Sequence, residues 1–331
     1  MPHTLPFEPP VFDDVLAAAE RIKGHAVRTP LLESPLLNER LGGRLLVKPE
    51  CLQRTGSFKF RGAFNRISMI PEEDRKNGIV AYSSGNHAQG VAAAANMLGA
   101  PATIIMPEDA PAIKRANTEA WGATVQTFNR YTESREEIGD ALAKEKGATI
   151  VRPYDDPGVM AGQGTVGLEI SEQLDALGAQ ADVVLVCCGG GGLVSGTALA
   201  LSNRKPGLPV YSVEPANFND TERSLEVGER VENQSGAQSI CDALLAPTPG
   251  ELTFQLNSKL LKAGLSVSDD EALEAMAIAF ETLKIVIEPG GAVALAAALS
   301  GRLDINGKTI VAVASGGNVD AAMFNRALGK L

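Results

Sequence analysis

Short apolar segments alternate with helical patterns along most of the 331-residue chain. Uninterrupted apolar and β-branched residues predict strands at 78–84, 101–107, 123–129, 148–153, 181–188, 208–215 and 308–315. Apolar residues at helical spacing predict helices at 87–100, 112–122, 133–147, 165–174 and 266–284. Continuous apolar strands that alternate with helices indicate parallel sheets with helices on both faces. The pattern therefore predicts an α/β fold.

Two local patterns refine this prediction. Ser268 and Glu271 have the spacing of a capping box, which predicts that the last long helix begins there. Residues 216–256 are rich in Asn, Gly, Pro and Thr and predict a long irregular loop. Loops of that length are usually functional or mobile.

Composition narrows the classes of partner. The chain has 30 Lys and Arg against 40 Asp and Glu, and its net charge of −10 argues against nucleic acid or an anionic membrane. Residues 1–14 lack the basic and apolar parts of a secretory signal, and no apolar run is long enough to span a membrane. Four cysteines without a CxxC pair and only three histidines disfavour a zinc site. We expect a cytoplasmic protein that binds a small molecule.

Four consecutive glycines, Gly189 to Gly192, follow one predicted strand and precede a helical stretch. Glycines let backbone N–H groups crowd around an anion, and a helix N-terminus adds a favourable field. A plain tight turn is the alternative interpretation, but one or two glycines suffice for such a turn. We therefore expect this loop to bind a phosphate group.

Two nucleotide-binding interpretations fit the glycines less well. A Walker loop requires Gly-Lys-Ser/Thr, whereas Leu193, Val194 and Ser195 follow here. The G-x-G-x-x-G fingerprint of dinucleotide-binding proteins is also absent, although Glu214 ends the next strand where a ribose-binding acid would lie. A dinucleotide-dependent oxidoreductase remains an alternative.

Polar turns follow two other predicted strands, at residues 83–87 (SSGNH) and 315–318 (SGGN). Carboxyl ends of strands in open α/β sheets are where ligands bind, so these turns would flank the phosphate. Lys59 lies between two phenylalanines, and burial lowers the pKa of a lysine and frees its amine as a nucleophile. A phosphate cradle with a desolvated lysine points to pyridoxal phosphate.

These motifs occur in the order found in fold-type II pyridoxal-phosphate enzymes. The motifs are TGSFKFRGA (55–63), SSGNHAQG (83–90), AGQGT (161–165), GGGG (189–192), IEPGGAVALAA (287–297) and SGGN (315–318). Residues 10–325 resemble most the serine/threonine dehydratase and serine racemase group. The resemblance implies two open twisted sheets flanked by helices. It also implies a small substrate-side domain at 80–155 and a large cofactor-binding domain made of 1–79 and 156–331.

The resemblance implies a role for each residue of the cofactor site. Lys59 would hold the cofactor covalently, with Phe58 packed against its ring. Asn86 would donate to the 3′-oxygen of the cofactor, and Ser315 would face its pyridine nitrogen. The residues that would cradle the phosphate are Gly189, Gly190, Gly191, Gly192 and Leu193.

Substrate recognition is also implied by the resemblance. The carboxylate would be held by Ser83, Ser84, Asn86 and His87. Ser84 occupies the place of a second, opposite-face base in serine racemases. Arg135 aligns with an arginine that reaches a distal carboxylate, which makes 3-hydroxyaspartate a candidate substrate. The alternative is an exposed helix arginine paired with an acidic neighbour, namely Glu136, Glu137 or Asp140.

The segment EPANFND, residues 214–220, resembles the divalent-cation site of serine racemase-like proteins. Glu214, the carbonyl group of Phe218 and Asp220 would bind Mg²⁺, or Ca²⁺ or Mn²⁺ in its place. All-oxygen ligation of this kind suits hard cations. A solvated acidic loop is the alternative interpretation.

The predicted function is dehydration and deamination of a 3-hydroxy amino acid to a 2-oxo acid and ammonia, with threonine, serine and 3-hydroxyaspartate as candidate substrates. A serine such as Ser315 cannot keep the pyridine nitrogen protonated, which favours elimination over transamination. A racemase on the same scaffold is one alternative, and a non-catalytic ligand sensor is another. The resemblance also implies a homodimer.

Overall fold

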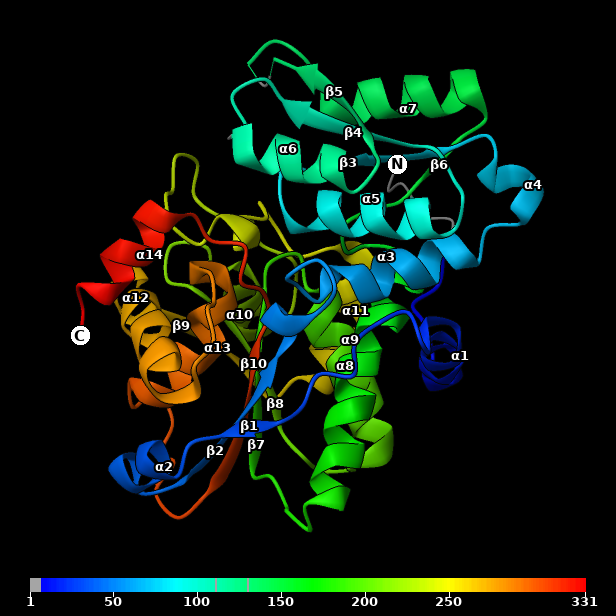
Figure 1. Cartoon of the computed structure of the whole chain (residues 1–331). Coiled ribbons are helices and arrows are strands. Elements are labelled where there is room, and N and C mark those ends of the chain that lie inside the picture. Colours follow the sequence, from blue (N-terminus) through cyan, green and yellow to red (C-terminus); the bar gives the residue numbers. More distant parts are fainter. Residues whose placement is uncertain (1–6, 111, 130) are drawn as a thin grey trace.

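The structure is a computed structural model that describes residues 7–110, 112–129 and 131–331. Residues 1–6, on which the expectation about a secretory signal partly rests, lie outside this range. The described strands form two sheets, one of six strands in the order β1-β2-β10-β7-β8-β9 and one of four in the order β5-β4-β3-β6 (Figure 1). The predicted α/β fold with two helix-flanked sheets is confirmed.

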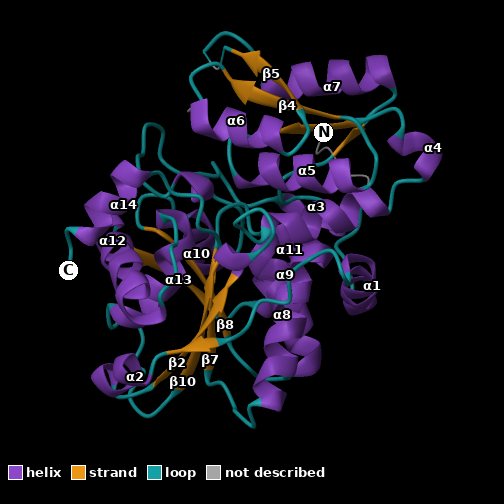
Figure 2. Ribbon diagram, viewed as in Figure 1, coloured by secondary structure: helices purple, strands orange, loops and turns teal. Residues whose placement is uncertain are grey.

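The six-stranded sheet is parallel except at one edge, where β1 pairs antiparallel with β2. Its strands are β1 (Leu32–Glu33), β2 (Arg44–Pro49), β7 (Val183–Cys187), β8 (Val210–Pro215), β9 (Ala263–Val267) and β10 (Thr309–Ala314). Figure 2 shows helices on both sides of this sheet, which agrees with its nearly continuous burial.

The four-stranded sheet is parallel throughout. It consists of β3 (Ile79–Tyr82), β4 (Ala102–Pro107), β5 (Thr124–Phe128) and β6 (Thr149–Ile150). These strands come from one continuous part of the chain, between two parts that build the larger sheet. The domain division expected from the resemblance, with residues 80–155 as the small domain, stays a prediction.

Helices account for most of the remaining regular structure. They are α1 (Phe12–Ile22), α2 (Pro35–Leu41), α3 (Lys59–Ser68), α4 (Glu72–Arg75), α5 (Asn86–Met97), α6 (Ala112–Ala120), α7 (Arg135–Lys146), α8 (Pro157–Ala176), α9 (Gly192–Arg204), α10 (Asp220–Val227), α11 (Glu251–Leu260), α12 (Asp269–Ile278), α13 (Pro289–Leu299) and α14 (Ala321–Leu328). Short 3₁₀ turns lie at Glu50–Leu52 and Asp242–Leu244. None of the described helices is both long and apolar enough to cross a membrane.

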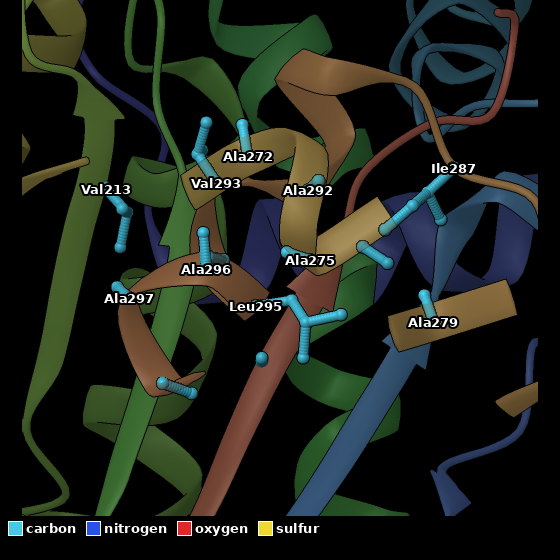
Figure 3. Close-up of a cluster of buried hydrophobic side chains, with 14 of the residues drawn as sticks. Val213, Ala272, Ala275, Ala279, Ile287, Ala292, Val293, Leu295, Ala296 and Ala297 are labelled. Atoms are coloured by element: carbon cyan, nitrogen blue, oxygen red, sulfur yellow. The ribbon is translucent and has the colours of Figure 1, made fainter. Parts of the chain in front are cut away.

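The largest apolar core packs α12 and α13 against the six-stranded sheet (Figure 3). Helix α13 is buried on all sides from Pro289 to Ala298, so its sequence is apolar throughout and lacks a polar face. Small side chains such as Ala275, Ala292 and Ala296 let the two helices approach closely. This packing fixes the segment that precedes α13, where Glu288 lies.

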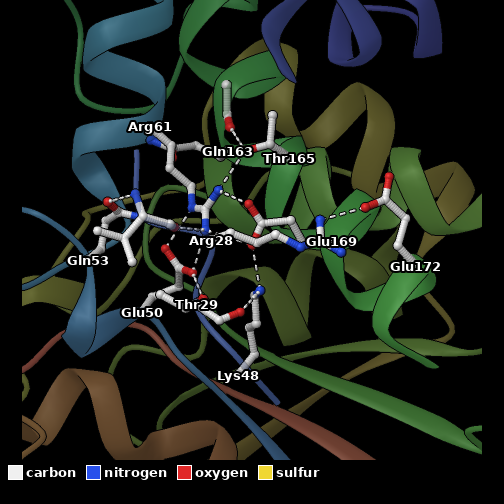
Figure 4. A network of polar contacts seen from close by, with 12 residues as sticks. Arg28, Thr29, Lys48, Glu50, Gln53, Arg61, Gln163, Thr165, Glu169 and Glu172 are labelled. Atoms are coloured by element: carbon white, nitrogen blue, oxygen red, sulfur yellow. Dashed lines mark hydrogen bonds and ion pairs between the residues drawn. The ribbon is translucent and has the colours of Figure 1, made fainter. Parts of the chain in front are cut away.

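A buried ion network anchors α3 (Figure 4). The guanidinium group of Arg61 donates to Glu50 and to Glu169, each at 2.7 Å, and Lys48 donates to Glu169 at 2.6 Å. Arg61, Lys48 and Glu50 have no exposed side-chain surface. The network ties α3, which begins at Lys59, to both β2 and α8.

Two predictions about helices need correction and one is confirmed. The capping box of Ser268 and Glu271 is present at the start of α12. Within the helical stretch 266–284 the predicted helix was too long only at its C-terminal end, because α12 passes into a π-helical turn at Ala279–Leu283. Residues 216–256 are not wholly irregular, since α10 forms at their start and ends at Gly228, whose positive φ of 83° stops the helix.

Candidate active site

In each sheet the strand order changes direction at a point beside one cavity. In the large sheet β8 and β9 extend to one side of β7, and β10 lies on its other side. In the small sheet β4 and β5 extend to one side of β3, and β6 lies on its other side. Ligands of open α/β sheets bind at such switch points, outside the carboxyl ends of the strands. The loops after β3, β6, β7 and β10 all line a single cavity of about 520 Å³.

Lys59 lies in this cavity as the first residue of α3. Its amine donates a hydrogen bond of 2.7 Å to the carbonyl oxygen of Pro153 and lies 5.2 Å from the ring centre of Phe58. Burial lowers the pKa of Lys59 to about 8. The amine is thus available as a neutral nucleophile close to neutral pH.

The tetraglycine loop forms a close-fitting wall of the same cavity. Gly191 has a φ of +94°, and α9 begins at the next residue. A Cβ atom at Gly190 would lie 2.5 Å from atoms of the Tyr154 ring, and one at Gly191 would lie 2.8 Å from Oγ1 of Thr253. Only glycine fits at these positions, and the first backbone N–H groups of α9 have no partner within their helix. These features suit a phosphate group.

Asn86 and Ser315 line the cavity from the carboxyl ends of different sheets, after β3 and β10 respectively. Asn86 begins α5 and donates through Nδ2 to Oε1 of Glu288 at 2.6 Å. Its Oδ1 accepts from Nδ2 of Asn318 at 2.7 Å. Ser315 follows β10, is 4 % exposed, and accepts a hydrogen bond from the Phe58 N–H through its carbonyl oxygen. The structure therefore brings these predicted cofactor residues and Lys59 to one place.

His87 follows Asn86 in α5, and its side chain is buried. Burial, together with the positive charge of Lys59, lowers its pKa to about 3, so its ring is neutral. Nε2 lies 2.9 Å from the carbonyl oxygen of Val151, which makes Nε2 the protonated nitrogen and leaves Nδ1 as an acceptor. The side chain thus has no N–H to offer a carboxylate, and the predicted role of His87 in substrate binding depends on its backbone N–H.

The position of Arg135 agrees with both interpretations of its role. Its Nε donates to Glu136 at 2.7 Å, as expected for a helix arginine with an acidic neighbour. It also lines the cavity, with its guanidinium carbon 5.4 Å from the ring centre of Tyr82. Ser83 and Ser84 line the cavity beside it. A partly exposed guanidinium stacked on a ring can still accept a carboxylate.

The two predicted carboxylate ligands, Glu214 and Asp220, lie close enough to affect each other's charge, and neither is among the residues that line this cavity. Glu214 is fully buried at the end of β8 and accepts the N–H groups of Thr221 and Glu222 at 3.0 and 2.8 Å. Oδ1 of Asp220 accepts from Asn233, whereas its Oδ2 is buried without a partner among the described residues. Burial raises the pKa of Asp220 to about 6, and burial with the charge of Asp220 raises the pKa of Glu214 well above its usual value. Two buried carboxylates with an unpaired oxygen fit a hard divalent cation.

The described residues contain no group of three or more His, Cys, Asp and Glu side chains that could hold a metal ion. The predicted set has only two carboxylates, Glu214 and Asp220, and a backbone carbonyl. It would therefore rely on oxygen atoms from backbone and water.

Several cavity residues were absent from the sequence prediction. Tyr154 packs on the glycine loop, Tyr82 makes a cation–π contact with Arg135, and Glu288 accepts a hydrogen bond from Asn86. Asn318, which also contacts Asn86, was expected only as part of the polar turn 315–318. A signal for Glu288 was available, since it is a single acid in the otherwise apolar run IVIEPGGA. Tyr154 and Tyr82 lie at strand ends without any motif of their own.

Comparisons with known proteins agree with this geometry. The family model described as "Pyridoxal-phosphate dependent enzyme" matches residues 22–316. L-threo-3-hydroxyaspartate ammonia-lyase of Saccharomyces cerevisiae is 44% identical over 315 residues, which cover 95% of each chain. Serine racemase of Schizosaccharomyces pombe is 40% identical over 95% of this chain and 96% of its own. The crystal structure of a threonine deaminase from T.th. has a TM-score of 0.88 and 42% identity over 94% of this chain and 99% of its own. The chain therefore belongs to the pyridoxal-phosphate-dependent enzymes of fold type II.

Proposed function

We propose that the protein is a pyridoxal-phosphate-dependent ammonia-lyase. It would eliminate water from a 3-hydroxy amino acid, and hydrolysis of the resulting imine, which takes up one water again, would release ammonia and a 2-oxo acid, with 3-hydroxyaspartate as the preferred substrate. The observation that carries this proposal is the buried Lys59 amine in one cavity with the glycine cradle and Arg135. The 3-hydroxyaspartate ammonia-lyases and the threonine deaminase among the relatives support the reaction type.

The chain supplies a base at the reacting carbon. When bound, the cofactor provides an electron sink that makes the α-proton of an amino acid acidic. Lys59 takes that proton, because its pKa, lowered to about 8, makes a larger fraction of the amine neutral than in an ordinary lysine, and its position is held by the Pro153 carbonyl. Ser315, a neutral hydroxyl, cannot keep a pyridine nitrogen protonated as a carboxylate would. Prompt loss of the β-hydroxyl is therefore favoured over slower reactions.

Two groups of residues would bind the substrate carboxylates. Ser83, Ser84 and the N-terminus of α5 offer hydroxyl and backbone N–H donors to the α-carboxylate. Arg135 would bind the distal carboxylate of 3-hydroxyaspartate through its guanidinium fork. The guanidinium carbon of Arg135 lies 5.4 Å from the ring centre of Tyr82, and this cation–π contact would hold the guanidinium at the cavity wall.

The experiment measures 2-oxo acid release from L-threonine, L-serine and the isomers of 3-hydroxyaspartate. We expect 3-hydroxyaspartate to turn over fastest, and Arg135→Ala to lower its kcat/KM by about 100-fold while changing that of threonine less than about threefold. Arg302→Ala, which removes an exposed arginine paired with Glu271, is the matched control. Equal losses on all substrates would show that Arg135 does not read the distal carboxylate. An enzyme that binds the cofactor yet turns over none of these substrates would instead fit a ligand sensor.

Racemisation is a second candidate activity. Ser84 lines the cavity together with Lys59, and a hydroxyl on the other face of the substrate could return a proton there. The 40% identity to a serine racemase supports this possibility. If it holds, Ser84→Ala abolishes formation of the D-isomer and retains 2-oxo acid release. Loss of both activities would show that Ser84 serves substrate binding instead.

A divalent cation is part of the proposal. Glu214, Asp220 and the carbonyl oxygen of Phe218 would hold Mg²⁺, or Ca²⁺ or Mn²⁺. The unpaired Oδ2 of Asp220 supports this assignment. The cation would neutralise two buried carboxylates next to α10, and its role would be structural because the site lies outside the cavity that contains Lys59.

We also propose a cytoplasmic homodimer. All four cysteines, which are Cys51, Cys187, Cys188 and Cys241, are free, as is usual in a reducing compartment. Two apolar side chains, Leu52 and Val286, expose 48% and 43% of their surfaces. Cys51, the neighbour of Leu52, and Val286 both lie close to Gly317, because a Cβ atom there would be 3.0 Å from Cys51 Cβ and 2.5 Å from the Val286 carbonyl oxygen. Light scattering of the purified protein tests the dimer.

A further inference from the structure

The amide group of Asn86 is held between two side chains of the larger sheet's loops. Asn86 comes from α5, next to the small sheet, whereas Glu288 precedes α13 and Asn318 follows β10. Its Nδ2 lies 2.6 Å from Glu288 Oε1, and its Oδ1 lies 2.7 Å from Asn318 Nδ2. Both hydrogen bonds therefore join the start of α5, which follows a strand of the small sheet, to loops beside the large sheet.

A backbone carbonyl fixes the direction of these hydrogen bonds. Nδ2 of Asn318 also lies 2.9 Å from the carbonyl oxygen of Thr55, which can only accept. The other hydrogen of Asn318 Nδ2 then points to Asn86 and requires the amide oxygen of Asn86 on that side. The NH₂ group of Asn86 must face Glu288. One of its two hydrogens is used there, and the second is left for a ligand in the cavity.

Glu288 is built into its position. It is 3% exposed, and its own N–H donates to the carbonyl oxygen of Gly316. A Cβ atom at Gly316 would overlap Oε1 of Glu288 and would lie 3.1 Å from Nδ2 of Asn86. The glycine after Ser315 thus leaves the space in which the Glu288–Asn86 pair forms.

Charged groups from several elements act on Glu288. Burial raises the pKa of Glu288 most, the negative charge of Asp242 adds to this, and the resulting pKa is about 7. The hydrogen bond from Asn86 and the positive charge of Lys114 lower it. Asp242 lies in the 3₁₀ turn before α11, and Lys114 of α6 forms an ion pair with it. Cys51 lies in the turn after β2, and burial first, then the charges of Glu50 and Glu288, raise the pKa of its thiol.

We propose that Glu288 is a positioning residue for the cofactor: it holds Asn86 so that the remaining amide N–H faces the 3′-oxygen, and its charge sets the electrostatics there. This inference rests on the proposed contact of Asn86 with the cofactor. A neutral Glu288 tolerates an ionised 3′-oxygen beside Asn86. An ionised Glu288 disfavours it, because two negative charges would share one amide group. The colour of the bound cofactor should then change with pH in step with Glu288.

The test follows the absorption spectrum of the bound cofactor from pH 5.5 to 9. The wild type should show a transition near pH 7, and Glu288→Gln should lose it, because glutamine keeps an acceptor for Asn86 without a charge. Asp242→Asn should move the transition to lower pH, since it removes a negative neighbour of Glu288. Glu251→Gln, at a cavity carboxylate that pairs with Arg230, is the matched control and should leave the transition in place.

Equilibrium binding of pyridoxal phosphate to the apoprotein gives a second readout. Glu288→Ala frees the Asn86 amide and should weaken binding about tenfold, whereas Glu288→Gln should stay within about threefold of the wild type. An unchanged spectral transition in Glu288→Gln would overturn the inference. A wild type that takes up no cofactor would overturn the proposed function itself, so the two failures are distinguishable.

Discussion

The amine of Lys59 donates a hydrogen bond of 2.7 Å to the carbonyl oxygen of Pro153. The bond joins the first residue of α3 to the segment between β6 and α8. A carbonyl oxygen orients the amine but carries no charge that would stabilise its protonated form, and burial dominates its titration. The structure thus keeps a reactive amine in place without a carboxylate partner.

Capture of the cofactor should depend on this amine. We expect the rate at which the apoprotein binds pyridoxal phosphate covalently to rise with pH and to reach half of its maximum near pH 8, because the pKa of Lys59 is lowered to about 8. Lys59→Ala should form no covalent adduct after borohydride reduction, as measured by intact mass. Lys205→Ala, at a partly exposed lysine paired with Asp175, should label like the wild type. An adduct on Lys59→Ala would place the attachment elsewhere.

The Arg61 network should matter for stability more than any surface pair. Arg61→Met leaves Glu50 buried without its main partner, and we expect a loss of about 3–5 kcal/mol in the free energy of unfolding. Arg28→Ala removes an exposed ion pair with Glu172 and should cost less than about 1 kcal/mol. Urea denaturation of the two variants measures both values. Similar losses of unfolding free energy in the two variants would show that the buried network stabilises the fold no more than a surface ion pair does.

The same network should make stability depend on pH. Burial alone would raise the pKa of Glu50, but the charge and hydrogen bonds of Arg61 outweigh it and hold the pKa below its usual range. A carboxyl group with a lowered pKa stabilises the folded state above its unfolded pKa, and this contribution is lost as the pH falls below about 4. Unfolding free energies at pH 3.5 and 6 should therefore differ less in Arg61→Met than in the wild type.

Helices α3 and α8 cross at glycines, which gives a packing prediction. A Cβ atom at Gly162 would lie 2.6 Å from Cα of Gly62 and 2.8 Å from the carbonyl oxygen of Arg61. These are backbone atoms that cannot turn aside, so Gly162→Ala should destabilise the fold by about 1–3 kcal/mol despite the better helix propensity of alanine. Gly329→Ala, where the nearest atom is 3.4 Å away, should change stability by less than about 0.5 kcal/mol. Thermal unfolding compares the two.

The local sequence predicted the structure correctly at positions where only a few residue types fit. Gly189 to Gly192 and the capping residue Ser268 indicated their roles, because backbone approach and capping each require particular residues. The contact between Glu288 and Asn86 became visible only in three dimensions, since the two residues lie 202 positions apart in the sequence. The course of α10 was missed because its residues are mostly polar and gain their helical form partly from Glu214, which accepts two of its N–H groups.

The cation proposed for Glu214 and Asp220 should stabilise the protein in a pH-dependent way. Mg²⁺ added to chelator-treated protein should raise the melting temperature, because a ligand that binds only the folded state stabilises it. The effect should be full at pH 7.5 and shrink below about pH 6, where protons compete for Asp220, whose pKa is raised to about 6. Asp220→Asn should abolish the response, and Asp304→Asn, at an exposed carboxylate, should retain it. A rise in melting temperature that is the same in Asp220→Asn would place the cation at another site, whereas no rise in the wild type would leave two buried carboxyl groups that share protons and bind no metal.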